Sequence, residues 1–129
     1  MNLPDDLPAL SESQLEVMQV LWSRGESTLG EVWAELSSKR KLAKNTVQTL
    51  LTRMVDKGWV TYRQEGNSFV YKSTRERQSA RKQIVQRVLD AAFEGSTEGL
   101  VMSLLDARPV SPEEAERIKA LIDQAEKQS

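Results

Sequence analysis

The sequence predicts a mainly α-helical fold with one β-hairpin, and three observations support this class. Apolar residues recur with helical spacing in six segments, three of which open with the residues of a capping box. Gly25, Gly58 and Gly95 stand where helices are expected to end. Over residues 59–71 polar and apolar residues alternate instead, on either side of a Gly-Asn turn, which predicts two paired strands.

Two helices are expected before residue 40, each with its own capping box. In "LSESQLEVMQVLW", Ser11 can accept a hydrogen bond from the backbone of Gln14, and Gln14 can return one, which fixes the first turn. In "TLGEVWAELSSK", Thr28 and Glu31 repeat this arrangement. The short basic connection "SKRKLAK" then leads to a third helix.

The third helix, within "NTVQTLLTRMVDKGWV", has an apolar face and an unusual polar face. The apolar stripe consists of Val47, Leu50, Leu51, Met54 and Val55. The opposite face carries Asn45, Thr49, Arg53 and Asp56, flanked by Thr46, Gln48 and Thr52. A solvated helix face normally carries good helix formers such as Glu, Lys and Ala, whereas threonine costs helix propensity. This face is therefore expected to contact something other than water.

Three helices followed by a hairpin form the plan of a winged helix-turn-helix domain. In helix-turn-helix proteins the second helix of the motif lies in the major groove, where its outer face meets base edges. Threonine, asparagine, glutamine and arginine can all bind bases there. The hairpin is then the wing, and the candidate contacts to the DNA backbone are Lys39, Arg40, Lys41, Lys44, Arg63, Asn67 and Lys72. The sequence therefore predicts double-stranded DNA as the partner.

The distribution of charge supports this expectation, although the net charge is only −1. Residues 39–82 carry twelve basic and three acidic side chains, whereas residues 1–38 carry one basic and seven acidic side chains. Residues 83–129 carry five basic and nine acidic side chains. A phosphate responds to charges within about one Debye length, roughly 8–10 Å, so a local basic band outweighs the acidic total. An ordinary solvated basic surface is the alternative.

Three further helices are expected in residues 74–129, as a dimerisation domain after a DNA-binding domain at residues 1–73. A unit this small buries too little apolar surface to be stable alone, so pairing with a second copy is expected. A homodimer also suits DNA, because a two-fold protein reads an inverted repeat. The alternative is that these helices fold back on the first domain. The residues expected at the dimer interface are Ile84, Val88, Leu89, Phe93, Leu100, Val101, Leu104, Leu105, Ile118, Leu121 and Ile122.

The composition excludes several classes of function. The chain has 129 residues and neither cysteine nor histidine, which rules out a disulfide scaffold, a thiolate nucleophile, a Ser-His-Asp triad and the usual zinc sites. A small nuclease would need clustered carboxylates, but Asp56, Glu65 and Glu76 in the basic stretch are not spaced as a metal cluster. No catalytic residue, metal or cofactor is therefore expected.

The sequence also indicates where the protein is located in the cell and which class of partner it binds. No apolar run approaches the 18 or so residues of a membrane span, and the acidic start lacks the apolar region of a signal peptide. A cytoplasmic protein without membrane insertion is therefore expected. The alternative to DNA binding is a winged-helix module that binds another protein. The polar, threonine-rich face of the third helix disfavours it, because the core of a protein interface is apolar.

Taken together, these segments resemble the penicillinase-repressor family, the bacterial repressors of β-lactamase and methicillin-resistance genes. The likeness rests on "LSESQLEVMQVLW", "NTVQTLLTRMVDKGWV", "GNSFVYKS" and "GSTEGLVMSLLD", and it runs from about Leu10 to Ala125. It implies a dimeric repressor that binds an inverted-repeat operator. Carried over to this chain, the resemblance assigns base reading to Asn45, Gln48, Thr49 and Arg53, and a contact near the DNA backbone to Thr46.

The chain departs from the family pattern at the third helix. The two best-known members carry Lys and Arg at the positions of Asn45 and Gln48, which implies a different half-site for this chain. Ala43 stands where those members have a capping serine, which implies a less firmly fixed start of the helix.

The resemblance also implies a mechanism of release. In the family, a membrane-bound sensor with a cytoplasmic metalloprotease leads to cleavage of the repressor in its C-terminal domain, and the dimer falls apart. The best-known scissile bond joins Asn to Phe, and the matching pair here is Ser103–Leu104, which keeps the apolar residue but lacks the asparagine. A copper-responsive branch with a cysteine cluster is excluded, because this chain has no cysteine.

Overall fold

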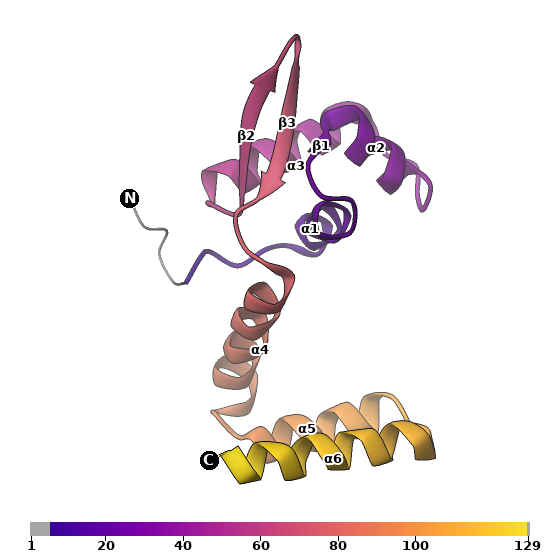
Figure 1. The fold of residues 1–129 in the computed structure, drawn as a ribbon, viewed down its shortest axis with the longest axis vertical. Coiled ribbons are helices and arrows are strands. Elements are labelled where there is room, and N and C mark those ends of the chain that lie inside the picture. Colours follow the sequence, from indigo (N-terminus) through magenta and orange to yellow (C-terminus); the bar gives the residue numbers. More distant parts are fainter. Residues whose placement is uncertain (1–5, 129) are drawn as a thin grey trace. The chain divides into compact units, whose positions relative to one another are not determined.

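The computed structural model describes residues 6–128, which form six helices and three strands (Figure 1). In chain order the elements are α1 (Glu12–Arg24), β1 (Ser27–Thr28), α2 (Leu29–Ser37), α3 (Lys44–Asp56), β2 (Val60–Glu65), β3 (Ser68–Ser73), α4 (Arg77–Phe93), α5 (Thr97–Ala107) and α6 (Pro112–Gln128). The predicted fold class is confirmed. Two compact units divide between residues 84 and 85, and α4 begins in the first unit and continues into the second.

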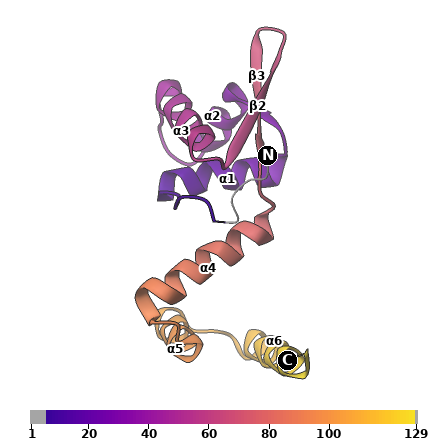
Figure 2. The same ribbon diagram turned by 90° about the vertical axis from the view of Figure 1, so that its left-hand side faces the viewer.

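The first unit is held together by the apolar faces of its three N-terminal helices, which lie at the base of the hairpin (Figure 2). Trp59, just before β2, is almost fully buried, and its Nε1 donates a hydrogen bond of 2.7 Å to the Pro8 carbonyl. The fully buried side chains of α1, α2 and α3 are Val17, Met18, Val32, Val47, Leu51 and Met54. Because the inner face of α3 is fixed in this core, its polar face lies outside.

Gly58 sets the direction in which the wing leaves α3. Its φ is +89°, a conformation that side chains rarely adopt, and a Cβ there would lie 3.2 Å from Cδ2 of Leu7. The turn is closed by the Trp59 amide, which donates to the Met54 carbonyl, and by the Thr74 hydroxyl, which donates to the Gly58 carbonyl. The expectation that Gly58 ends the third helix is confirmed.

The wing belongs to a three-stranded antiparallel sheet with the order β1-β3-β2. In the hairpin Tyr62 pairs with Tyr71 and Glu65 pairs with Ser68, on either side of the predicted two-residue turn. Gly66 takes a φ of +63° in this turn. The strand β1 was not predicted from the sequence, because two residues cannot show an alternating pattern.

Both predicted capping boxes of the first unit are present. Ser11 and Gln14 exchange hydrogen bonds at the start of α1, and Thr28 and Glu31 do the same at the start of α2. The Thr28 amide, which donates to the Glu31 carboxylate, holds the pKa of Glu31 below its ordinary value. This contact therefore contributes stability that is present at neutral pH and is lost as the pH falls through that lowered pKa. By contrast, Ala43 at the N-cap of α3 makes no side-chain cap hydrogen bond.

Replacing Ala43 with serine is expected to stabilise the start of α3. The backbone of Ala43 is extended, with φ −75° and ψ 144°, which is the conformation in which a serine hydroxyl can accept from the first turn. Such a cap contributes about 1 kcal/mol to the free energy of unfolding. Urea unfolding followed by circular dichroism measures this difference.

Ala34→Ser is the matched control, because it makes the same chemical change at an exposed position inside α2. Serine is a poorer helix former than alanine there, so this variant should lose about 0.5 kcal/mol. A gain at both positions, or none at Ala43, would contradict the assigned cap geometry.

The second unit consists of the rest of α4 together with α5 and α6. The side chain of Ser96 caps α5, and Ser111 accepts a hydrogen bond of 3.1 Å from the Glu114 amide, as predicted for the last helix. None of the described residues of α5 and α6 is fully buried. An apolar groove of about 450 Å³ lies between these two helices, lined among others by Val101, Leu104, Leu105, Val110, Ile118 and Ile122.

The residues expected at a dimer interface are partly or fully exposed in the single chain. Ile84, Leu89, Phe93, Leu100 and Ile118 are half-buried, and the exposed ones are Val88, Val101, Leu104, Leu105, Leu121 and Ile122. Residues 74–84 belong to the first compact unit, because Ala80 is buried there and Gln83 donates to the Leu7 carbonyl. The functional division between residues 73 and 74 stays a prediction.

Candidate nucleic-acid interface

The polar face of α3 is exposed along its whole length. Asn45, Thr46, Gln48, Thr49, Thr52, Arg53 and Asp56 all lie on the surface, while Val47, Leu51 and Met54 on the other side are fully buried. The division of the helix into two faces is therefore as predicted. The assignment of individual residues to bases stays a prediction.

The threonines of this face are already engaged by the helix itself. The Thr49 hydroxyl donates to the Asn45 carbonyl at 3.1 Å, and the Thr52 hydroxyl donates to the Gln48 carbonyl at 2.9 Å. A hydroxyl whose hydrogen is used in this way offers an outside group an acceptor oxygen and a methyl group, but no donor. The sequence alone did not reveal this restriction.

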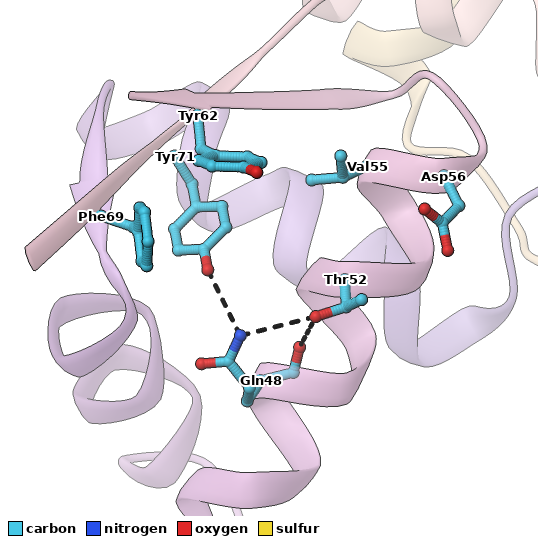
Figure 3. Close-up of a pocket in the computed structure, with 7 residues that line it drawn as sticks. All are labelled: Gln48, Thr52, Val55, Asp56, Tyr62, Phe69 and Tyr71. Atoms are coloured by element: carbon cyan, nitrogen blue, oxygen red, sulfur yellow. Dashed lines mark hydrogen bonds between the residues drawn. The ribbon is translucent and has the colours of Figure 1, made fainter. Parts of the chain in front are cut away.

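Gln48 connects the helix to the wing. Its Nε2 lies 3.4 Å from the Tyr71 hydroxyl on β3 and 3.5 Å from the Thr52 hydroxyl (Figure 3). Both contacts are long, so they orient the amide rather than hold it tightly. Tyr71 was not singled out by the sequence, yet the two-residue wing turn fixes the register that places it opposite Tyr62.

The side chain of Arg53 has no hydrogen-bonding or ion-pair partner among the described residues, so its guanidinium is available to a ligand. Lys39, Lys41 and Lys72 are exposed, and the Lys44 ammonium lies 5.9 Å from the centre of the Trp33 ring. These cations come from the α2–α3 connection, the first turn of α3 and the wing. They belong to the accessible part of the predicted basic band.

Two of the arginines expected to contact phosphates are instead paired with carboxylates. Arg40 lies 2.8 Å from the Glu16 carboxylate. Arg63 lies 2.6 Å from Glu26 and 2.8 Å from Glu65, and these hydrogen bonds, with that of Glu26 the stronger, raise the pKa of the guanidinium. The partners Glu16 and Glu26 are distant in sequence, so no local pattern indicates them.

Within the described part of the chain, no three acidic side chains gather as a metal site would require. No helix there is long and apolar enough to cross a membrane.

Both the sequence and the fold of this chain match those of known proteins. The family model described as penicillinase repressor matches residues 10–124. The chain belongs to the penicillinase repressor family. The resemblance predicted from the sequence is therefore confirmed, and it covers both compact units.

Two relatives illustrate how far this chain has diverged in sequence. The penicillinase repressor of Bacillus licheniformis is 27% identical over 118 residues, which cover 92% of each chain. The methicillin resistance regulatory protein MecI of Mammaliicoccus sciuri is 21% identical over 114 residues, or 88% of this chain and 93% of that one.

A solved structure of a relative covers more than half of this chain. The monomeric form of Bacillus licheniformis BlaI, in complex with the blaP half-operator, has a TM-score of 0.51 and 34% sequence identity to this chain. The match covers 57% of this chain and 90% of that one. The predicted winged-helix architecture is thus found in a relative whose structure includes DNA.

Proposed function

We propose that this protein is a sequence-specific transcriptional repressor that binds an inverted-repeat operator in double-stranded DNA as a homodimer. The observation that carries the proposal is the exposed polar face of α3, in which Arg53 has no partner among the described residues. Membership of the penicillinase repressor family, and the likeness to a repressor solved with its half-operator, support it. The proposal assigns the protein no catalytic residue, metal or cofactor, and places it in the cytoplasm, where the operator is.

In this proposal α3 lies in the major groove. Arg53 can donate two hydrogen bonds to guanine, which is the commonest specific contact of an arginine. Thr49 accepts from the exocyclic amine of adenine or cytosine, or places its methyl group against that of thymine, because its own hydrogen is used. Asn45 and Gln48 read neighbouring bases through their amide groups.

Contacts to the phosphates then position this helix. Lys39, Lys41, Lys44 and Lys72 are accessible for this role, with Thr46 and Asn67 as neutral donors. Arg40 and Arg63 can offer a phosphate only the N–H groups that their carboxylate partners leave free, unless they exchange these partners for the phosphate. The protein's own acidic groups therefore compete with DNA at these two positions.

Replacing Glu65 with glutamine is expected to tighten binding to any DNA by about two- to five-fold, because an exposed ion pair contributes up to about 1 kcal/mol. The change removes one of the two carboxylates that hold Arg63. If Arg63 then gains a phosphate contact, the slope of log affinity against log salt becomes steeper by about 0.9. Fluorescence anisotropy at several salt concentrations measures both quantities.

Glu35→Gln is the control for this prediction. Glu35 pairs with Arg24, which is not among the proposed DNA contacts, and the change removes the same charge. It should leave the salt slope as it is. Equal effects of the two substitutions would mean that Arg63 does not reach a phosphate.

Dimerisation is assigned to the second unit. The exposed apolar side chains of α5 and α6 surround the groove between these two helices. Burial of such residues against the same surface of a second copy removes apolar area from water, and the two-fold axis so created matches an inverted repeat.

Release by proteolysis is the proposed route of induction, through a membrane-bound sensor-protease. Ser103 and Leu104 lie in α5, and both side chains are exposed. A protease needs its substrate extended, so α5 must first unfold locally. Within one chain α5 has no fully buried side chain, so the cost of this local unfolding comes mainly from the proposed dimer contacts, which must open at Leu104.

Selection of bound fragments from sheared genomic DNA of the source organism tests the proposed function. Purified protein at near-physiological salt should recover a few fragments that share one inverted repeat. DNA without a shared motif would mean that only phosphates are bound, and no recovery would favour a winged-helix module that binds another protein.

A further inference from the structure

A pocket of about 230 Å³ lies between the outer side of α3 and the wing (Figure 3). Gln48, Thr52, Val55 and Asp56 line it from α3, and Tyr62, Phe69 and Tyr71 line it from β2 and β3. Drug-sized ligands occupy sites of roughly 300–1,000 Å³, so this pocket suits a smaller molecule.

One end of the pocket is aromatic. The ring of Tyr62 lies 5.2 Å from that of Phe69 at an interplanar angle of 87°, and 5.9 Å from that of Tyr71. The three rings gather on the side of the wing in Figure 3. Tyr62 and Phe69 are about half exposed, so part of each side chain is accessible to a ligand. The face of an aromatic ring carries negative electrostatic potential and attracts cations.

The other end of the pocket is acidic. Among the seven described residues that line the pocket, Asp56 alone is charged, and Figure 3 shows it at the end away from Phe69. Asp56 is also the last residue of α3, where the helix dipole adds partial negative charge. Within the pocket, Asp56 therefore disfavours a phosphate or carboxylate ligand, and the rings and the carboxylate together favour a cation, although the surrounding segment 39–82 is basic.

We propose that this pocket is a binding site for a small organic cation of the quaternary ammonium class. The cationic centre lies against the exposed ring of Tyr62, Val55 contacts its alkyl groups, and Asp56 supplies the opposite charge. Tyr71, which is only 5% exposed, forms the back of the pocket. Each attraction is weak at an exposed site, so selectivity comes from their convergence in one small volume.

A ligand in this pocket is also expected to change DNA binding, and this expectation rests on the proposed function. Gln48 lines the pocket and directs its Nε2 toward the Tyr71 hydroxyl. A bound cation repels this amide nitrogen and attracts the amide oxygen, so it turns Gln48 away from the orientation found in the free protein. A ligand in the pocket therefore weakens reading of the base assigned to Gln48.

The binding step is tested on the free, full-length protein by ¹H–¹⁵N NMR titration with choline chloride, against sodium chloride at equal ionic strength. The expected result is saturable shifts confined to α3 and the wing. The neutral isostere 3,3-dimethylbutan-1-ol should bind at least about five-fold more weakly, because it lacks the charge. Shifts that do not saturate, or equal binding of the isostere, would overturn the proposal.

Two variants and one control localise the site. Tyr62→Leu removes the ring that contacts both other aromatic residues, and Asp56→Asn removes the charge; each should weaken choline binding by about two- to five-fold. Asp90→Asn removes an exposed carboxylate from α4 and should change nothing. An equal loss of choline affinity in all three variants would mean that choline is attracted to the acidic surface in general and not bound in this pocket.

The coupling to DNA is measured separately, as operator affinity with and without saturating choline. We expect choline to reduce the affinity of the unaltered protein by several-fold, and to have less effect on Asp56→Asn. If choline binds as described but operator affinity does not change, the pocket stands and its coupling to Gln48 is wrong. If the protein does not bind DNA specifically, the NMR titration still shows whether the pocket binds choline.

Discussion

Replacing Arg53 with alanine is expected to weaken binding to the cognate operator by about 1–3 kcal/mol per half-site, or about 5- to 150-fold. Arg53 lies on the exposed face of α3, and no other described residue holds its guanidinium. It therefore needs to break no internal contact before it pairs with guanine. Fluorescence anisotropy with a labelled operator measures the loss.

Two comparisons distinguish base reading by Arg53 from non-specific attraction of its charge to DNA. Binding to unrelated DNA should fall much less, because a base contact contributes only at the correct sequence. Arg81→Ala removes the same charge from an exposed position of α4 and should preserve the preference for the operator. Equal loss on cognate and unrelated DNA would assign Arg53 to a phosphate instead.

Replacing Leu104 with aspartate is expected to convert the protein to a monomer. Leu104 is 59% exposed and lines the apolar groove between α5 and α6, so in the proposed dimer it would be covered by the second copy. A charge buried there without a partner is strongly unfavourable. Loss of the second half-site should then weaken operator binding by about 100-fold or more. Sedimentation velocity measures the oligomeric state.

Met102→Asp is the matched control for this substitution. Met102 lies on the same helix and is 61% exposed, but it does not line the groove. The Met102→Asp substitution should therefore leave the dimer intact. If Leu104→Asp also remains dimeric, the groove is not the interface, and the dimer must form through another surface of the chain.

The elements of this fold follow from the sequence because their signals are local. Ser11 and Gln14, or Thr28 and Glu31, lie within one helical turn of each other, and both capping boxes are present. The inner face of α3 follows from the spacing of residues such as Val47 and Leu51. A two-residue turn likewise indicates the hairpin and its register.

The properties of the candidate site depend on contacts between distant residues, and these were not predicted. Glu26 and Arg63 are 37 residues apart in sequence, and nothing in either segment indicates that they pair. The two residues of β1 are too few to show a period. The register of the hairpin is enough to predict that Tyr62 pairs with Tyr71. That α3 packs against these two residues can be seen only in the tertiary structure.

If a dimer reads an inverted repeat through α3, its affinity must depend on both half-sites, and one comparison of three duplexes measures this dependence. Anisotropy at near-physiological salt is measured with the selected inverted repeat, with the same duplex after one half-site is scrambled, and with unrelated DNA. Two protomers should bind the intact repeat at least about 10³-fold more tightly than unrelated DNA, and scrambling one half-site should cause a marked loss of affinity. Equal affinity for all three duplexes would contradict a dimer that reads an inverted repeat through α3.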